Sequence, residues 1–320
     1  MSGKINTEKL RSEDIKQAVS LWREQFRRFC PVQALFSLWE NNTTGIESHL
    51  QKTISAGNAI KAVQDGEMVG FIAFDIFDFH GSMSMMCHFW GNGAIAKNRK
   101  EIYLALYTAS CNYCIKHGVL SHYIPLNAND KELIDMFFDL GFGAYVADAF
   151  AHYEQPCGSE SELNICQAAV TETEQLGRLY AGSAAYFKAA PIHLKLPRCS
   201  LDEIAEKIRA GYVYIAKDGE KIIGAFSLRI SENDDIYRFV PKGNCFICDG
   251  LGAYIAEEYR GRGIGSHFMH IFSEYCISNR IPVAHVDWET FNPYGNRFWR
   301  KYFTPTILAM KRTLHPDMLR

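Results

Sequence analysis

The sequence has no apolar run long enough to cross a membrane, and this absence excludes one class of protein. A membrane-spanning helix needs about 18 or more largely apolar residues in succession, and no window of the chain reaches that length without interruption. The first 22 residues carry charges every few positions, unlike a secretory signal or a transit peptide. We therefore expect a cytoplasmic protein without a membrane partner.

An excess of positive charge is also missing. The chain has 34 Lys and Arg against 36 Asp and Glu, a net charge of -2. This balance gives no general attraction to nucleic acid or to an anionic membrane surface. We expect no nucleic-acid partner, and any anion-binding site must come from a local cluster.

The cysteines do not have the pattern of a metal site. Two pairs have the spacing C-x-x-C: Cys111 with Cys114, and Cys245 with Cys248. The first pair lies in a helical pattern and the second in a strand, where residues three apart face opposite ways. We predict buried, reduced thiols and no metal.

What the sequence does contain is an internal repeat. The segments AIKAVQDGEMVGFIAF and YVYIAKDGEKIIGAFSL follow Ala56-Gly57 and Ala210-Gly211, respectively. Each has an Asp-Gly pair between alternating apolar residues, which is a strong signal of a β-hairpin. The 320 residues, 48% of them hydrophobic, provide material for two cores. Two copies of one fold are predicted.

The repeat extends to the helices on both sides of the hairpins. Each copy begins with helical segments, and the second has capping-box patterns at Thr171 with Glu174 and at Ser200 with Glu203. A strand, a long helix, a strand, a short helix and a closing strand follow each hairpin. The polar segment 155–162, broken by Pro156 and Gly158, is the natural linker. We therefore divide the chain into residues 1–157 and 158–320.

A glycine-rich loop in the second copy is the main functional signal. It consists of Arg260, Gly261, Arg262, Gly263, Ile264 and Gly265, between an apolar strand and an amphipathic helix. Glycines let the main chain approach a ligand, and the helix N-terminus and both arginines favour an anion. The spacing differs from the dinucleotide fingerprint, and the P-loop lysine is missing. An ordinary tight turn is the alternative interpretation.

The pattern Arg260-x-x-Gly263-x-Gly265 resembles the Q/R-x-x-G-x-G/A acyl-CoA motif of the GNAT superfamily of N-acetyltransferases. The order of elements in both copies also resembles that fold: an α+β class with two tandem GNAT-like domains, each a mixed, largely antiparallel sheet flanked by helices. The resemblance implies acetyl-CoA as co-substrate and an amine acceptor, which is a small molecule, an amino acid or a peptide. The first copy has no glycine pair at 93–101, so we expect it to be a degenerate partner.

The resemblance also implies roles for individual residues. The strand 246–255 would lie beside the pantetheine arm, with the N–H of Ala253 polarising the thioester carbonyl and Ile255 pairing with the arm's amides. Asp249 stands where several GNAT enzymes carry the base. Asn292 matches the family's asparagine near the CoA arm, but Gly295 replaces an alanine and Trp299 stands at the usual position of the acidic tyrosine. Tyr302, one turn later, is then the candidate acid.

Several alternatives for these residues stay open. His285, Asp287 and Glu289 share one strand face by period two, so they are the rivals of Asp249 for the base role, unless the stripe is only a solvated face. Asp249 itself is equally consistent with a strand end bonded to the next main-chain groups. Tyr294, Phe298 and Tyr302 are spaced at i, i+4 and i+8, which favours a core position for Tyr294. Asn292 before a proline is also a good helix cap.

Two other functions fit parts of the pattern. A protein with an incomplete set of catalytic groups would bind acyl-CoA as a sensor or scaffold without transferring the acyl group. Some proteins with two GNAT-like domains move amino acids from aminoacyl-tRNA, but these favour a basic surface, and this chain has a charge of -2. We therefore expect an acetyl-CoA-dependent N-acetyltransferase.

Overall fold

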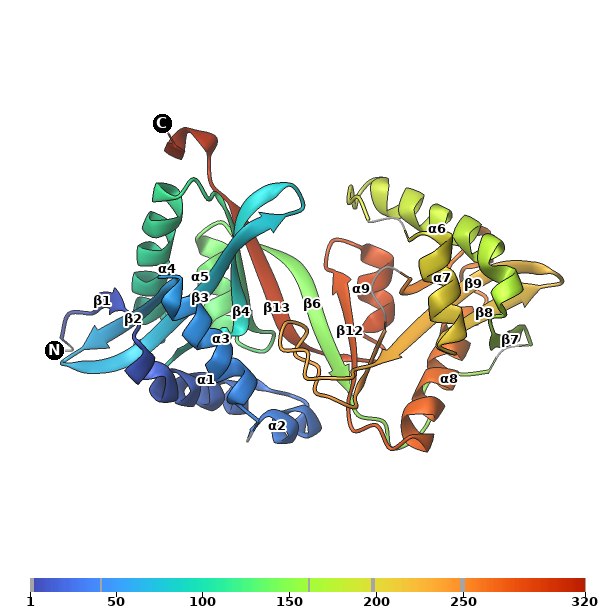
Figure 1. The fold of residues 1–320 in the computed structure, drawn as a ribbon, viewed down its shortest axis with the longest axis horizontal. Helices are drawn as coiled ribbons and strands as arrows, with labels where there is room; N and C mark the ends of the chain where they lie inside the picture. Colours follow the sequence, from blue (N-terminus) through green and yellow to red (C-terminus); the bar gives the residue numbers. More distant parts are fainter. Residues whose placement is uncertain (1–2, 41, 161, 197–198, 248–250, 320) are drawn as a thin grey trace. The chain divides into compact units, whose positions relative to one another are not determined.

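The computed structural model describes residues 3–40, 42–160, 162–196, 199–247 and 251–319 (Figure 1). The chain forms two compact units. The first contains Met1–Asp148, Asp234–Phe239 and Pro305–Arg320, and the second contains Ala149–Asn233 and Val240–Thr304. The units follow the order of the chain only in part, because two later segments belong to the first unit. The proposed division at residues 157/158 concerns sequence repeats and stays a prediction.

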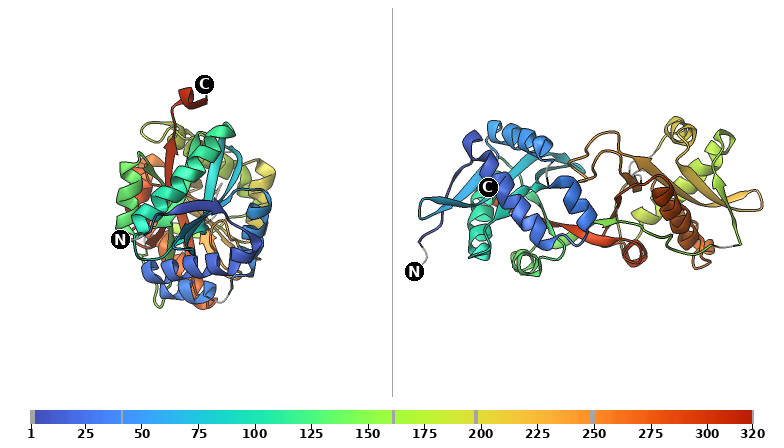
Figure 2. Two further views of the ribbon diagram at one scale, coloured as in Figure 1. Left: turned by 90° about the vertical axis from the view of Figure 1, so that its left-hand side faces the viewer. Right: turned by 90° about the horizontal axis from the view of Figure 1, so that it is seen from below.

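The first unit is a mixed sheet with helices on both of its faces. Its helices are α1 (Ile15–Phe29), α2 (Gln33–Trp39), α3 (Thr44–Ser55), α4 (Arg99–Lys116) and α5 (Lys131–Asp139). Its strands are β1 (Asn6–Lys9), β2 (Ala59–Gln64), β3 (Glu67–Phe79), β4 (Ser82–Ala94), β5 (Ser121–Asn127) and the first part of β6 (Gly143–Ala151). Figures 1 and 2 show α4 on the opposite side of these strands from α1 and α3. Apolar residues of α4 and α5 pack on the strands in one buried cluster.

The closing strand of the chain, β13 (Thr304–Thr313), belongs almost wholly to the first unit. It pairs antiparallel with β5, from Ile307 opposite Asn127 to Thr313 opposite Ser121 (Figure 1). We expected this strand to close the second copy. It pairs with β5 because every residue of β5 is buried, so its second edge needs a partner for its main-chain groups.

The second unit repeats the arrangement of the first. Its helices are α6 (Thr173–Lys188), α7 (Leu201–Arg209), α8 (Ile264–Ser278) and α9 (Pro293–Trp299). Its strands are β7 (Asn164–Gln167), β8 (Val213–Asp218), β9 (Lys221–Ile230), β10 (Cys245–Ile247), β11 (Ala253–Ile255) and β12 (Ala284–Glu289). Strands β7 to β10 are antiparallel neighbours, whereas β10 and β12 run parallel. The mixed, largely antiparallel α+β class predicted from the sequence is confirmed.

The two predicted hairpins are present at the expected turns. Asp65 and Gly66 both have positive φ, as the tight turn between β2 and β3 requires. Gly219 has φ 58° between β8 and β9. The cap of α7 at Ser200 with Glu203 is also confirmed, and Gly211 ends that helix with φ 79°. The box at Thr171 is wrong, because Glu172 bonds back to Ala169 and α6 begins at Thr173.

A segment from the second half of the chain is held inside the first unit. Residues 234–239 are anchored by two indoles, since Trp39 donates to Phe239 O at 3.2 Å and Trp90 donates to Ile236 O at 3.1 Å. The Phe239 ring is fully buried and stacks on Trp39 with centroids 4.4 Å apart. The two indole donors and the stacked Phe239 ring therefore hold this segment in the first unit.

Of the cysteines in the two pairs, Cys114 and Cys245 are buried as predicted, whereas Cys111 is only half-buried. Cys111 and Cys114 lie in α4, and Cys245 lies in β10, 3.5 Å from the Cys276 sulfur. Cys248 lies outside the described residues. In the described ranges, no group of three or more His, Cys, Asp and Glu is arranged to hold a metal ion. Nor does any described helix have the length and hydropathy needed to cross a membrane.

A buried ion pair closes the start of α4 in the first unit. Arg99 is the first residue of that helix, and its guanidinium bonds to Asp130, which caps α5. Their side chains are 3% and 1% exposed. The guanidinium also lies 4.8 Å from the Phe29 ring. Removing one partner of such a pair leaves a buried charge without compensation.

Arg99→Met should therefore destabilise the first unit by about 3–5 kcal/mol. Urea unfolding followed by tryptophan fluorescence measures the effect, because Trp22, Trp39 and Trp90 belong to this unit. The matched control is Arg28→Met, since Arg28 contacts the same Phe29 ring from an exposed position. Equal, small losses in both variants would show that the buried pair does not support the fold.

Candidate functional site

The glycine-rich loop leads into the N-terminus of α8. Gly261 and Gly263 have φ of 78° and 82°, a region that favours glycine, and Gly263 is the N-cap of α8. The first main-chain N–H groups of a helix have no acceptor within the helix. In α8, the first bond from the helix to its cap runs from His267 N to Gly263 O. The loop thus presents a cluster of N–H donors that fits an anion.

Gly265 is required by packing. A Cβ at this position would lie 2.8 Å from Cε2 of Phe298, a residue of α9. The phenyl ring therefore rests directly on the first turn of α8. The third glycine of the motif brings α8 and α9 together, while the first two shape the loop.

The strand before the loop separates from β12 while it stays paired with β9. We predicted one strand over residues 246–255, but the structure has two short ones, β10 and β11. β10 pairs with both β9 and β12, whereas β11 pairs with β9 alone. The sheet therefore opens between β11 and β12.

The hydrogen bonds show which main-chain groups face this opening. Ser227 N donates to Gly252 O, and Ala256 N donates to Ile223 O. Because bonded and non-bonded pairs alternate in an antiparallel ladder, the N–H groups of Ala253 and Ile255 point away from β9. These are the two residues that the resemblance assigned to the thioester and the pantetheine arm.

Tyr254 lies on the sheet face that α6 and α7 cover. It stands opposite Ala225, which belongs to the buried cluster of those helices. Arg229 lies four positions after Ala225 in β9 and therefore on the same face. It pairs with Phe246, and Phe246 pairs with His285 of β12, so both of these residues share that face. By period two, Asp287 and Glu289 share this face with His285 and Tyr254.

The three residues of this stripe differ in their surroundings. His285 is fully buried, with its ring 4.8 Å from that of Phe150, so it belongs to the core. Asp287 is exposed. Glu289 is half-buried at the end of β12, and burial, with a smaller contribution from Asp287, raises the pKa of its carboxyl. Because a raised pKa makes a carboxylate a better proton acceptor, Glu289 is a candidate base of the stripe.

Arg260 turns from the loop toward the opening. Its Nε donates to Ile255 O at 3.1 Å. Its guanidinium lies 4.6 Å from the ring centroid of Tyr186, 5.6 Å from that of Tyr254 and 5.8 Å from that of Tyr294. Arg262 points elsewhere, to the Tyr259 ring and Glu258 O. In the described part of the chain, no carboxylate lies within ion-pair distance of either guanidinium.

Asn292 connects these elements. Its side chain caps α9 by accepting from Gly295 N at 3.1 Å, and it accepts a second bond from the Tyr186 hydroxyl at 2.8 Å. The predicted cap is therefore confirmed. Tyr294 is 57% exposed, so the core position favoured by its spacing is wrong. It lies in the first turn of α9, where side chains still face the solvent.

Tyr302 follows α9 and is half-buried. Its ring centroid lies 5.2 Å from that of Phe298, the residue that covers Gly265. Its main-chain oxygen accepts a bond from Tyr153. The candidate acid thus borders the start of α8 through one aromatic neighbour. Asp249, the candidate base, lies outside the described residues, and its role stays a prediction.

The geometry agrees with the comparison to known protein families. Residues 183–303 match the model of the acetyltransferase (GNAT) family. This span assigns a GNAT acetyltransferase domain to the segment that holds the glycine loop, the opening and all three tyrosines around Arg260. The family model does not match residues 1–182.

Solved structures share the fold over nearly the whole chain. A GCN5-related N-acetyltransferase from Sphaerobacter thermophilus matches with a TM-score of 0.57 and 11% identity, covering 97% of this chain and 95% of that one. A GCN5-related glucosamine N-acetyltransferase region of a fungal multi-domain GH3 β-N-acetylglucosaminidase matches with a TM-score of 0.53 and 13% identity. This match covers 97% of the present chain but only 38% of the fungal protein's chain. Among curated proteins, none matches the sequence significantly.

The first unit lacks the loop of the GNAT domain. Just after β4, Ile95 N donates to Val69 O as Ala256 N donates to Ile223 O just after β11. In the first unit, residues 96 and 97 alone connect Ile95 to Asn98, the N-cap of α4. In the GNAT domain, the longer segment 257–262 connects Ala256 to Gly263, the N-cap of α8. Across the corresponding strands, Asn92 Nδ2 donates to Pro125 O at 3.2 Å. A side chain thus bridges the first unit where the GNAT domain is open.

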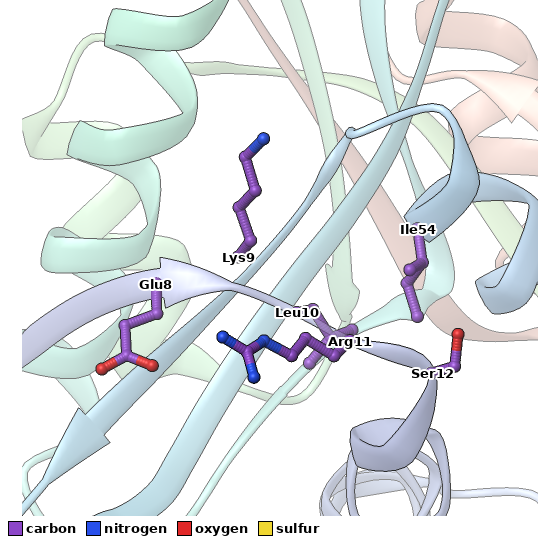
Figure 3. A pocket seen from close by; sticks show the side chains of 6 residues that line it. All are labelled: Glu8, Lys9, Leu10, Arg11, Ser12 and Ile54. Atoms are coloured by element: carbon purple, nitrogen blue, oxygen red, sulfur yellow. The ribbon is translucent and has the colours of Figure 1, made fainter.

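Two surface hollows differ in their relation to the GNAT domain. One, of about 530 Å³, lies in the first unit and is lined by Glu8, Lys9, Leu10, Arg11, Ser12 and Ile54. Figure 3 shows that its charged side chains point in different directions, so they do not converge on a ligand. The other, of about 450 Å³, lies in the GNAT domain between α6 and the segment 254–258, with Tyr254 in its lining.

Sequence reasoning missed Tyr186 and Tyr254 as part of the site. Tyr186 is in α6, far from the glycine motif along the chain, and no local pattern marks it. Tyr254 is the residue between Ala253 and Ile255, so strand alternation sends its side chain out of the sheet toward α6. The one available signal was the place of Tyr254 between two residues that the resemblance assigns to the ligand.

Gly265→Ala should destabilise the GNAT domain by about 1–3 kcal/mol, because the added methyl group collides with Phe298. The double variant with Phe298→Leu should recover part of the loss, as measured by urea unfolding. Gly261→Ala is the control, since a Cβ there meets nothing within 4 Å and only the positive φ opposes it. A loss in Gly265→Ala that Phe298→Leu leaves unchanged would contradict the packing role.

Proposed function

We propose that the chain is an acetyl-CoA-dependent N-acetyltransferase whose active site lies in the GNAT domain. The observation that carries the proposal is the opening between β11 and β12, which ends at the anion-binding start of α8. An extended ligand with amides at one end and phosphates at the other fits this arrangement. Acetyl-CoA has both, since its pantetheine arm carries amides and its other end a pyrophosphate.

The donor set supports this ligand at both ends. The N–H groups of Ala253 and Ile255 face the opening and suit the arm, as an edge strand binds an extended peptide. The N–H groups at the start of α8, with Arg260 and Arg262 close in sequence, suit the pyrophosphate. Gly261 and Gly263 shape the loop through their positive φ, and Ile264 begins α8. Asn292 stands at the start of α9, where it keeps the Tyr186 hydroxyl in place.

The reaction follows as direct transfer. The nitrogen of the neutral acceptor amine forms a bond to the acetyl carbon, and the bond from that carbon to sulfur breaks. The N–H of Ala253 stabilises the carbonyl oxygen as it gains negative charge. One proton leaves the nitrogen for a base, and the departing sulfur takes a proton from an acid. No other reactant is needed for the balance.

Glu289 is the base that the described residues favour. A primary ammonium has a pKa near about 10.4, so the acceptor must lose a proton before it attacks. A carboxylate with a raised pKa accepts that proton more readily than an ordinary one. Glu289 shares the α6 face with Tyr254, beside the opening. Asp249 remains the alternative that the family resemblance implies.

Tyr302 is the acid of the proposal. Its ring packs on Phe298, which covers the start of α8, so the phenol stands on the side of the opening where α8 and α9 lie. The indole of Trp299 at the family's usual position has no acidic hydrogen of this kind. It is buried, at 8% exposure, and its ring packs against Phe303.

The first unit is, in this proposal, a degenerate copy of the same domain. It has the same order of strands and helices, but its shorter loop, the Asn92 bridge and the buried Arg99–Asp130 pair fill the corresponding region. The proposed division at residues 157/158 describes these two copies. The structure of β13 adds that the first copy uses the closing strand of the chain.

The direct test is the release of thiol from acetyl-CoA with a panel of amines, amino acids and peptides. We expect release with at least one acceptor, and we expect Gly263→Val to abolish acetyl-CoA binding, because a β-branched residue cannot adopt its φ of 82° without strain. Saturating acetyl-CoA, at about 100 times its Kd, should stabilise the wild type by about 2.7 kcal/mol. Stabilisation without transfer to any amine would favour a sensor or scaffold. If acetyl-CoA gave no stabilisation and no thiol were released, both functions would be excluded.

Glu289→Gln should lower kcat by about 10²–10⁴-fold and remove the acidic limb of the kcat/KM profile. The sign follows from the base role: the carboxylate is active above its pKa, which is raised, so activity falls as the pH decreases through that value. Asp249→Asn is the matched comparison. If Asp249→Asn removes the limb and Glu289→Gln keeps it, the base is Asp249.

A further inference from the structure

The three tyrosines around Arg260 form a compact cluster, here called the tyrosine cage: Tyr186, Tyr254 and Tyr294. They come from α6, β11 and α9, so three separate elements converge on one cation. The Tyr186 and Tyr254 rings lie 6.4 Å apart, and the Tyr186 hydroxyl is held by Asn292. Aromatic rings at such distances attract a cation through their π-electrons. The three rings therefore form a cation site, and the guanidinium of Arg260 occupies it.

The guanidinium of Arg260 donates from Nε to Ile255 O, and its charge also interacts with the hydroxyls of Tyr254 and Tyr186. Ile255 O faces the same opening as the Ile255 N–H, where an extended ligand would pair with both groups. The guanidinium thus occupies part of the edge that the proposed arm of acetyl-CoA requires.

The loop gives this side chain a second destination. Arg260 is followed by Gly261, which is exposed and has positive φ, and the donors at the start of α8 lie just beyond. A charge-assisted bond from a guanidinium to a phosphate is stronger than a contact with an aromatic ring. A bound pyrophosphate would therefore draw the guanidinium out of the cage. The rings that it leaves are fixed by α6, β11 and α9.

We propose that the tyrosine cage is the subsite for a second cationic group on the acceptor, and that Arg260 occupies it until acetyl-CoA binds. The proposal rests on the proposed N-acetyltransferase function and names its acceptor class: an amine whose far end carries a guanidinium or an alkylammonium. The hollow beside Tyr254 gives a polar approach to the cage; Glu257 and Glu258 line it together with Arg178 and Lys221, and Lys221 pairs with Glu258. Glu289 lies on the same sheet face as Tyr254, where the reacting amine would be.

The first experiment compares two acceptors in the thiol-release assay. Agmatine carries a primary amine and a guanidinium, whereas butylamine has an uncharged far end. We expect a KM for agmatine about tenfold or more below that for butylamine. Tyr294→Leu should raise the KM for agmatine about tenfold and leave that for butylamine unchanged, and Tyr294→Phe should keep the wild-type value because the ring is retained.

The matched control is Tyr259→Leu. Tyr259 also contacts cations, with Arg262 at 4.9 Å and Lys221 at 5.0 Å from its ring, but it lies outside the cage. We expect this variant to leave the ratio of the two KM values unchanged. Equal KM values for agmatine and butylamine in the wild type, or an effect of Tyr259→Leu as large as that of Tyr294→Leu, would overturn the proposal.

The second experiment does not depend on turnover. Tetramethylammonium is titrated into protein with labelled tyrosine rings, and the ring signals are followed by NMR. We expect shifts of the cage signals in Arg260→Ala without CoA and in the wild type with CoA, but not in the wild type alone. Absence of shifts in Arg260→Ala overturns the subsite. Shifts there, with no thiol release for any amine, would retain the subsite and reject the transferase function.

Discussion

The site depends on the separation of β11 from β12. A strand inside a sheet normally has partners on both sides, because main-chain N–H and C=O groups need hydrogen bonds. Among the described strands, β11 has a partner on one side, β9, and its other edge faces an opening. The turn at Gly219 pairs β9 with β8, and β9 in turn pairs with β11. The glycine loop then connects β11 to α8. Ligand binding along the edge would complete the sheet.

The first unit has corresponding strands but closes them differently. Asn92 stands opposite Ile72 as Ala253 stands opposite Phe226, and its side chain spans to Pro125 O. At the start of the next helix, Asn98 is the N-cap where the GNAT domain has Gly263, and the buried Arg99 follows it. Side chains therefore bridge this region in the first unit, whereas the GNAT domain is open there. The proposal of one active and one structural copy rests on this contrast as well as on the missing motif.

Local patterns predicted the features that depend on neighbouring residues. The Asp65-Gly66 turn, the cap at Ser200 and the cap at Asn292 each need only a few consecutive residues, and the structure confirms them. The glycine motif also marked the start of α8. These features follow from main-chain geometry, which a short sequence determines.

Nonlocal features were beyond such reasoning. The placement of β13 beside β5 depends on an edge formed about 180 residues earlier in the chain. The tyrosine cage combines residues of three elements, none of which has a pattern of its own. The strand over 246–255 was expected to be continuous because its residues are apolar, and its break reflects the loss of β12 as a partner beyond Phe246. Each of these outcomes is set by which strands meet, and one sequence does not contain that information locally.

Amide hydrogen exchange at β11, measured by NMR with and without acetyl-CoA, tests the central claim most directly. The account predicts that acetyl-CoA slows exchange at the N–H groups of Ala253 and Ile255 and leaves Asn92 and Ala94, their counterparts in the first unit, unchanged. Unchanged exchange at Ala253 and Ile255 under saturating acetyl-CoA would contradict the account, because the opening would then not be where the arm binds.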